Sequence, residues 1–163
     1  MQLPEREPCP MCETVARKAW TYEGRDMPSA VVAESDLALA FIRHDRVDGY
    51  SYVVPKRHVP VLPELRPDEA IALMTMIHQV SRAVVAELAP EGLNVFQNNG
   101  LIANQTVPHV HFHVAPRSAE QMTSWTPDSD RWSGNIQPFE VRQRLAHRLS
   151  PHCEPAPPRV HEL

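Results

Sequence analysis

The clearest pattern along the chain is a helical repeat of apolar residues between residues 67 and 88. Apolar side chains recur there at steps of three and four residues, at Ala70, Leu73, Met74, Ile77, Val80, Val84 and Leu88. Such steps gather on one side of a helix, so the pattern predicts a helix with a buried face. Pro67 suits its first position, and the acidic Asp68 and Glu69 complement the positive end of the helix dipole. We interpret this apolar face as core packing.

Shorter apolar runs on either side of this helix predict a β-sheet. Strands are expected at residues 30–33, 37–43, 50–54, 93–97 and 107–116. Polar breaks such as Asp48-Gly49 separate the runs, and Pro55 ends the third strand. Residues 20–29 are expected to form a loop, because glycine, aspartate and proline interrupt any regular pattern there.

Two further helices are expected near the ends of the chain, at residues 10–19 and 139–149. The second of them would bury Phe139, Val141, Leu145 and Leu149. Strands in the middle with helices on either side indicate an α+β domain with an antiparallel sheet. We expect a single domain over residues 1–150, with residues 118–137 irregular. Prolines cluster after it, which predicts a disordered tail over residues 151–163.

Composition restricts the partners and the location of the protein. The chain has 163 residues, 42% of them hydrophobic and 22% charged, as in ordinary globular proteins. A net charge of −4 does not favour binding to nucleic acid through its phosphates. The N-terminus lacks the apolar core of a signal peptide, and no apolar run suggests a membrane span. We therefore expect a cytoplasmic protein without a nucleic-acid or membrane partner.

The chemistry of the chain is concentrated in Pro108-His109-Val110-His111-Phe112-His113-Val114. In a strand, successive side chains point to opposite faces, so the three histidines would share one face while the apolar residues enter the core. Imidazole can attack, donate a proton or bind a metal near neutral pH. A surface strand that happens to carry histidines is the plainer alternative, and the regular alternation argues against it.

Cys9-Pro10-Met11-Cys12 forms a Cys-x-x-Cys motif, which indicates either zinc binding or redox chemistry. A redox role would need a preceding strand in a thioredoxin-like frame, and this motif lies almost at the N-terminus. A zinc site would need two further ligands, for which His58 and His109 are the candidates. Two thiols without a metal remain the simplest alternative, but the richness in histidine favours zinc.

Amides and a hydroxyl lie on the loop that leads to the histidines, in Asn98-Asn99-Gly100 and Asn104-Gln105-Thr106. Such groups can hold phosphate oxygens or a ribose, although a plain polar turn has the same composition. The chain has neither a Gly-x-Ser-x-Gly elbow nor a Walker-type glycine-rich loop. A histidine is therefore the best candidate nucleophile. Arg117 and the Lys56-Arg57 pair could bind phosphate or simply be solvated.

These motifs resemble the signature of the histidine triad (HIT) superfamily of nucleotide hydrolases and transferases. The resemblance rests on residues 105–117, and the Cys-x-x-Cys start, Tyr52–His58 and Asn98–Gly100 follow in the expected order. It implies a HIT-like fold, with a five-stranded antiparallel sheet, a long helix and a C-terminal helix, and it implies a homodimer whose sheets adjoin.

The resemblance also implies a role for each site residue. His111 would attack the α-phosphorus and form a nucleotidyl-histidine intermediate, which water or another acceptor would resolve. His113, Asn98, Gln105 and Thr106 would contact the phosphate and orient the leaving group. A structural zinc ion, as in zinc-bearing bacterial members, would be held by four residues: Cys9, Cys12, His58 and His109.

Three positions depart from the pattern of the superfamily. Tyr50 stands where a histidine is common, Asn104 where a glycine is common, and Arg43 near the place of an acidic or amide residue beside the nucleoside. These changes suggest an altered substrate preference. We expect an enzyme for dinucleoside polyphosphates or nucleoside phosphoramidates, or for transfer to a special acceptor. The alternatives are a zinc-braced nucleotide-binding sensor or scaffold with little turnover and, less favoured, a redox protein.

Overall fold

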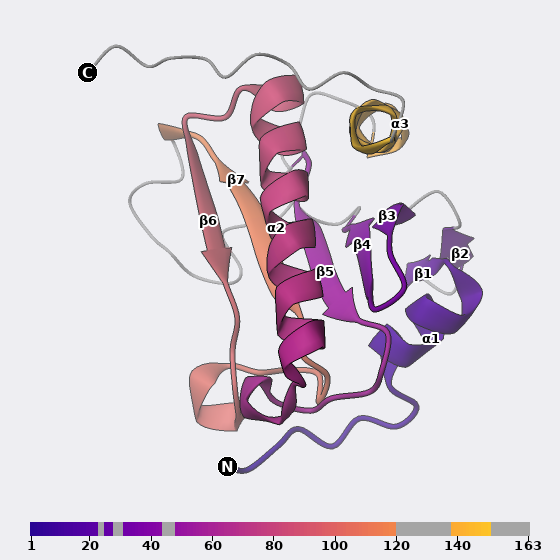
Figure 1. The fold of residues 1–163 in the computed structure, drawn as a ribbon, viewed down its shortest axis with the longest axis vertical. Helices are drawn as coiled ribbons and strands as arrows, with labels where there is room; N and C mark the ends of the chain where they lie inside the picture. Colours follow the sequence, from indigo (N-terminus) through magenta and orange to yellow (C-terminus); the bar gives the residue numbers. More distant parts are fainter. Residues whose placement is uncertain (23–24, 28–30, 44–47, 120–137, 151–163) are drawn as a thin grey trace.

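The structure, a computed structural model, describes residues 1–22, 25–27, 31–43, 48–119 and 138–150. Its elements follow one another along the chain as α1 (Pro10–Arg17), β1 (Trp20–Tyr22), β2 (Arg25–Met27), β3 (Val31–Glu34), β4 (Ala38–Ile42), β5 (Ser51–Pro55), η2 (Leu62–Glu64), α2 (Pro67–Leu88), β6 (Gly92–Phe96), η3 (Leu101–Ala103), β7 (Phe112–Arg117) and α3 (Pro138–Leu149) (Figure 1). The predicted tail and most of the predicted irregular segment after residue 118 lie outside the described residues.

The centre of the fold is the predicted antiparallel sheet of five strands, in the order β3-β4-β5-β7-β6. β5 pairs with both β4 and β7, and the register sets Tyr52 opposite Phe41 on one side and His113 on the other. The five strands lie within a few residues of the predicted ranges, except at the start of β7. Their arrangement confirms the α+β, HIT-like architecture.

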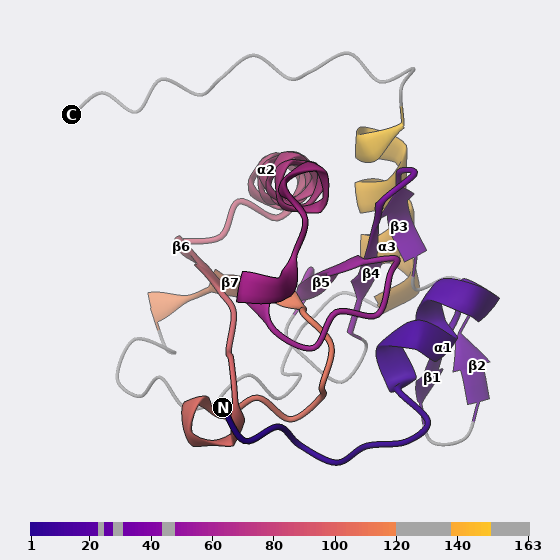
Figure 2. The ribbon, with the colours of Figure 1, turned by 60° about the horizontal axis from the view of Figure 1, so that its bottom comes forward.

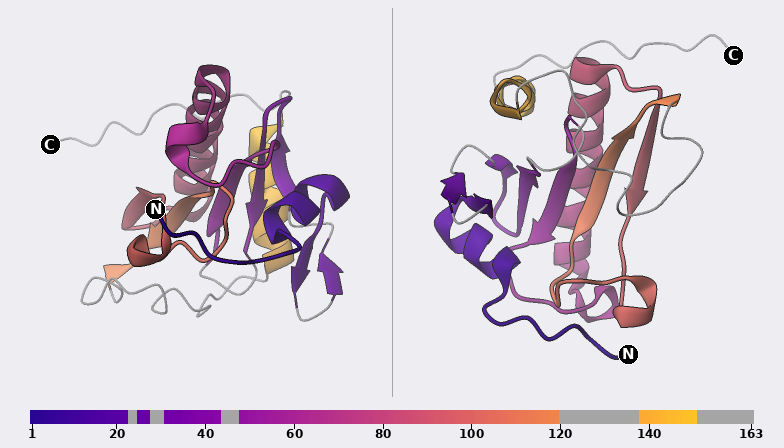
Figure 3. Two further views of the ribbon diagram at one scale, coloured as in Figure 1. Left: turned by 90° about the horizontal axis from the view of Figure 1, so that it is seen from below. Right: turned by 180° about the vertical axis from the view of Figure 1, so that it is seen from behind.

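Helix α2 occupies the predicted residues 67–88 and packs on β4, β5 and β7. Figure 2 shows it end-on above the sheet, and both views in Figure 3 keep it on the same side of the strands. Leu73, Ile77 and Val80 are buried as expected, and Met76 and Ala83 join them. Ala70 and Met74 are exposed, contrary to the prediction, because the buried face is rotated from the one that the apolar spacing suggested.

The two faces of the sheet carry different chemistry. The face under α2 and α3 is aliphatic, and Val53, Val110 and Val114 belong to its core. The other face carries Phe41 and the tyrosines of β5, in a second cluster that also includes Cys9 and Met11 from α1. The histidines lie on this second face, so α1 and the aromatic side chains surround them while the long helix stays behind the sheet.

Two predictions of local structure are wrong. Residues 20–29 are not all loop, because β1 and β2 pair as a short antiparallel hairpin. The last strand begins at Phe112 instead of residue 107. Ahead of it the chain bends at Pro108, where the His109 amide donates to the Val107 carbonyl at 2.8 Å. That tight turn takes residues 107–111 out of the strand ladder and separates His109 from the other two histidines.

Among the described residues, α2 is the one helix that could cross a membrane by length and composition alone. This is weak evidence, because the core helix of a globular domain passes the same test. In this structure the apolar face of α2 packs against the sheet.

Candidate active site and metal centre

The Cys-x-x-Cys motif and two distant histidines meet at one point. The ligand atoms of Cys9, Cys12, His58 and His109 all lie within 4.8 Å of one another. His109 Nδ1 is 3.6 Å from Cys9 Sγ and 3.5 Å from Cys12 Sγ, and His58 Nδ1 is 3.2 Å from Cys12 Sγ. These four residues could hold a metal ion, as the sequence predicted.

Helix α1 presents the two cysteines because it begins between them. Cys9 precedes its first residue, Pro10, and Cys12 lies in its first turn. Cys9 is buried and Cys12 is half-buried. Burial, followed by the influence of Cys9, raises the pKa of the Cys12 thiol to about 12. The thiol therefore keeps its proton near neutral pH until a cation displaces it.

His109 is fully buried and turned so that it can act as a ligand. Its Nε2 lies 3.0 Å from the carbonyl oxygen of Pro55, which can only accept a hydrogen bond, so Nε2 carries the proton. Burial lowers the pKa of His109 to about 4, so the ring is neutral at physiological pH. The lone pair of Nδ1 then points at both sulfur atoms. A hydrogen bond of this kind from the second ring nitrogen is typical of histidines that bind metals.

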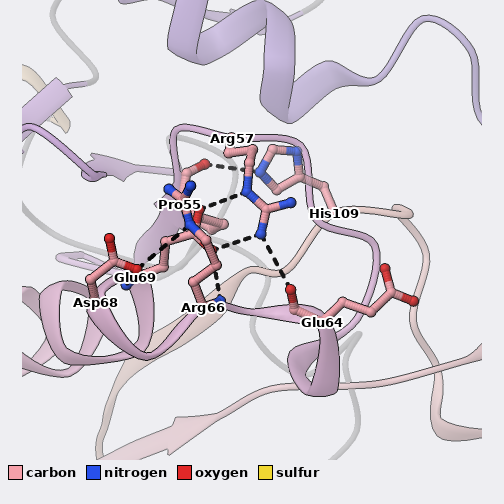
Figure 4. A network of polar contacts seen from close by, with 7 residues as sticks. All are labelled: Pro55, Arg57, Glu64, Arg66, Asp68, Glu69 and His109. Atoms are coloured by element: carbon pink, nitrogen blue, oxygen red, sulfur yellow. Dashed lines mark hydrogen bonds and ion pairs between the residues drawn. The ribbon is translucent and has the colours of Figure 1, made fainter.

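An ion pair between the exposed Arg57 and the buried carboxylate of Glu69 braces the loop that carries His58 (Figure 4). The carboxylate of Glu69 is 1% exposed and accepts hydrogen bonds from Nε and a terminal nitrogen of Arg57, at 2.7 and 2.8 Å. It also accepts one from the backbone of Arg66. Arg57 is therefore held by α2, which makes its role structural. Sequence reasoning assigned Glu69 only to the helix dipole and missed this contact.

His111 follows the candidate ligand His109 by two residues and is not itself one of the four candidate ligands. It is 3% exposed, and its Nδ1 donates to the carbonyl oxygen of His109 at 2.6 Å. Burial lowers the pKa of His111, so its ring is neutral near pH 7. With the proton on Nδ1, the lone pair lies on Nε2. The hydrogen bond thus identifies Nε2 as the unprotonated ring nitrogen, which the sequence left open.

His113 sits in an aromatic box next to His111, with 5.0 Å between the two ring centres. Its ring stacks on Phe96 at 4.1 Å and meets the Tyr52 ring edge-on at 4.8 Å. The hydroxyl of Tyr50 is hydrogen-bonded to His113 Nδ1 at 2.6 Å. These contacts fix the plane of the imidazole. Sequence reasoning noticed Tyr50 as a departure but missed Tyr52 and Phe96, although all three fall on the histidine face of their strands.

Of the predicted phosphate-binding residues, Gln105 is committed to the loop itself. It is 1% exposed, its side-chain oxygen accepts from the Gly100 amide, and its side-chain nitrogen donates to the carbonyls of Pro60 and Val107. Any effect of Gln105 on a phosphate is therefore indirect. Thr106 is exposed beside it, and the half-buried Asn98 donates to the Asn104 carbonyl at 3.3 Å.

Asn104 occupies the position where glycine is common in the superfamily, and it keeps a left-handed backbone, with φ of 61° and ψ of 29°. Asparagine is among the non-glycine residues that tolerate this region best. The loop conformation therefore does not require glycine.

Arg43 follows β4 and approaches the same face. Its guanidinium donates to the Tyr52 hydroxyl at 3.0 Å and lies over the Tyr52 ring, 5.4 Å from the centre. Tyr52 in turn contacts His111 edge-on at 5.3 Å. The Tyr52 ring therefore contacts both the Arg43 guanidinium and the imidazoles of His111 and His113.

Comparison with known proteins identifies the family to which this chain belongs. The model of the HIT domain family matches residues 24–120. The chain belongs to the HIT family. An adenosine 5'-monophosphoramidase of Schizosaccharomyces pombe is 37% identical over 97 residues, which cover 59% of this chain and 70% of that protein. An asymmetrical bis(5'-nucleosyl)-tetraphosphatase of the same yeast is 34% identical over 90 residues, 55% of this chain and 50% of that one.

Among solved structures, a zinc-bound histidine triad family protein from Mycobacterium smegmatis superposes with a TM-score of 0.68. The two are 26% identical, and the match covers 87% of this chain and 93% of that one. This HIT protein therefore shares its fold with that neighbour over most of both chains.

Proposed function

We propose that this HIT protein cleaves nucleotides at the α-phosphate through a nucleotidyl-His111 intermediate. The observation that carries the proposal is the tautomer of His111, because a neutral imidazole with its proton on Nδ1 presents a nucleophilic Nε2. Relatives named as a phosphoramidase and a tetraphosphatase support the class, since their substrates share a nucleotide α-phosphate and differ in the leaving group.

In the proposed reaction, Nε2 of His111 forms a bond to phosphorus while the bond to the leaving group breaks, and the leaving group departs with the electron pair. Water or another acceptor then attacks phosphorus, breaks the N–P bond and releases the nucleoside monophosphate. Charge develops on the phosphate oxygens, and donors held in place in advance stabilise it most effectively. His113, Thr106 and Asn98 are the proposed donors, with Gln105 holding their loop.

The test measures both turnover and the intermediate. The wild type is incubated with adenosine 5'-phosphoramidate and with diadenosine tetraphosphate, and release of AMP is followed alongside His111→Asn. We expect AMP from the wild type only, and a mass increase of one nucleotidyl group on a quenched wild-type sample. His147→Asn, an exposed histidine on α3, is the matched control and should turn over normally. Tight nucleotide binding without release would instead support a sensor or scaffold.

We further propose that the metal at the Cys9, Cys12, His58 and His109 cluster is zinc. Two thiolates and two imidazoles are a common donor set for structural, four-coordinate zinc. When bound, the ion would link the start of α1 to the His58 loop and to the turn before His111, as a brace without a chemical role. Cys9→Ser should lose zinc in metal analysis of the purified protein, while Cys153→Ser, which changes a thiol that is not one of the four proposed ligands, should not. Full zinc retention by Cys9→Ser would contradict the four-ligand site.

The protein is also proposed to act as a homodimer. β6 lies at an edge of the sheet and exposes Val95, and α2 exposes Ile71 and Met74. An edge strand and apolar side chains that the described residues leave exposed favour association with a second copy.

A further inference from the structure

On the face of the sheet that carries the histidines, the side chains follow one another in an order that the triad motif alone does not reveal. Along β5, the Pro55 carbonyl meets His109 at the metal end, Tyr52 pairs with His113, and the Tyr50 carbonyl accepts from the Arg43 amide at 2.9 Å. The backbone of Arg43 therefore lies at the end of the histidine row that is opposite to the metal cluster, and its guanidinium reaches back over the Tyr52 ring. The loop of residues 98–106 lies toward the other end, since β6 ends at Phe96 opposite His113 and the chain continues toward the start of β7.

The side chain of Arg43 is held on the face of the sheet that carries the histidines. Its amide bond to Tyr50 fixes its backbone, and its alternation with Leu39 and Phe41, which belong to the second core cluster, sets its side chain on the histidine face. The hydrogen bond to the Tyr52 hydroxyl and the position over that ring restrain the guanidinium. Arginine presents five donors in a planar fork, and this geometry matches phosphate oxygens.

We propose that Arg43 is an anion subsite that binds a second phosphate of the substrate. The inference rests on the proposed function, which puts the reacting phosphorus at His111. Because the guanidinium lies over the Tyr52 ring and that ring contacts His111, a phosphate of the substrate other than the reacting one can reach Arg43. That phosphate belongs either to a polyphosphate chain or to the ribose.

The neighbouring Arg117 provides a comparison within the same sheet. It shares the histidine face of β7 but lies farther along the strand, where its Nε donates to the side chain of Asn94 at 2.7 Å. Removing its charge alters the net charge of the protein as much as removing that of Arg43. A difference between the two variants therefore reports position rather than overall electrostatics.

The test measures binding without requiring turnover. Calorimetry with AMP, ADP and adenosine 3',5'-bisphosphate compares the wild type with Arg43→Gln, Arg43→Lys and Arg117→Gln. We expect ADP or the bisphosphate to bind the wild type at least about tenfold more tightly than AMP, as a charge-assisted contact allows. Arg43→Gln should remove that preference, Arg43→Lys should restore part of it, and Arg117→Gln should keep it. The ligand that shows the preference identifies the chain or the ribose as the source.

The outcomes separate this inference from the proposed function. If the wild type binds all three nucleotides equally, or if both glutamine variants lose the preference alike, the subsite is wrong and nucleotide binding stands. If the wild type binds none of them, the proposed function itself fails. Circular dichroism of each variant confirms that it folds before binding is compared.

Discussion

At the scale of single residues, the site depends on which nitrogen of each histidine holds a proton. His109 and His111 are fixed by backbone carbonyls, which can only accept hydrogen bonds. His113 is different, because its Nδ1 faces the Tyr50 hydroxyl, which can donate or accept. If Tyr50 donates, His113 keeps its proton on Nε2 and can donate it to a phosphate oxygen. The tyrosine thus acts as a positioning residue for His113.

The substitution Tyr50→Phe tests this role. It keeps the ring and removes the hydroxyl, so we expect kcat to fall about tenfold, the effect of losing one hydrogen bond of ordinary strength, while KM changes less. Nitrogen chemical shifts of His113 should move from one tautomer to a mixture. If those shifts stay unchanged in Tyr50→Phe, the hydroxyl does not set the tautomer. Tyr52→Phe, which removes the hydroxyl that contacts Arg43, should leave the His113 shifts in place.

Sequence reasoning found the residues of the site better than their contacts. The cysteines and histidines meet as predicted because few side chains bind metals, and their spacing restricts the choice. Amides are harder to assign, since the composition of a loop does not reveal whether an amide faces a ligand or the backbone. Gln105 proved to be a buried brace, and the importance of Glu69 depends on Arg57, which is distant enough in sequence for the pair to escape a local pattern.

At the scale of elements, the long helix was predictable and the last strand was not. Pro67 and the acidic first turn set the start of α2, and its apolar spacing extends over the whole helix, so local signals sufficed. The beginning of β7 depends on where β5 and β6 stop pairing with it, which is a tertiary property. The β1–β2 hairpin was missed because two strands of three residues leave too little pattern to detect.

The contact between α2 and the His58 loop predicts a specific response to acid. The Arg57 hydrogen bond lowers the pKa of Glu69 from 4.5 to about 2. Because the folded pKa lies below the ordinary one, the carboxylate stabilises the fold fully above about pH 4.5, and this contribution is lost as the pH falls toward 2.

Glu69→Gln should therefore lower the free energy of unfolding at neutral pH, since it leaves Arg57 without its ionic partner. It should also flatten the fall in stability between pH 4.5 and 2, as measured by urea denaturation at a series of pH values. Glu64→Gln is the control, because Arg57 bonds to the backbone carbonyl of Glu64 and not to its carboxylate. Equal acid sensitivity in wild type and Glu69→Gln would show that the pair does not brace the loop.

At the scale of the whole molecule, the two faces of the sheet have different roles. One face packs on α2 and α3 and provides the hydrophobic core, while the other gathers the metal ligands, the imidazoles and Arg43 around aromatic rings. Histidines directed into an aliphatic core would be unsatisfied polar groups. The alternation of the strands lets one short segment serve both faces, since Val110 and Val114 fill the core while His111 and His113 face the site.

The outer face of α2 leaves an apolar surface that the described residues do not cover. Ile71 is 68% exposed and Met74 is 58% exposed, and their spacing, three residues apart, sets them on one side of the helix. Burying such side chains against a second copy is favourable, while a charge there would have to be desolvated. In analytical ultracentrifugation we expect the wild type to sediment with twice the mass of one chain and Met74→Glu to shift toward the single-chain mass. Gln79→Glu adds the same charge at an exposed polar position of α2 and should remain dimeric, so a monomeric wild type, or a dimeric Met74→Glu, would exclude this face as the interface.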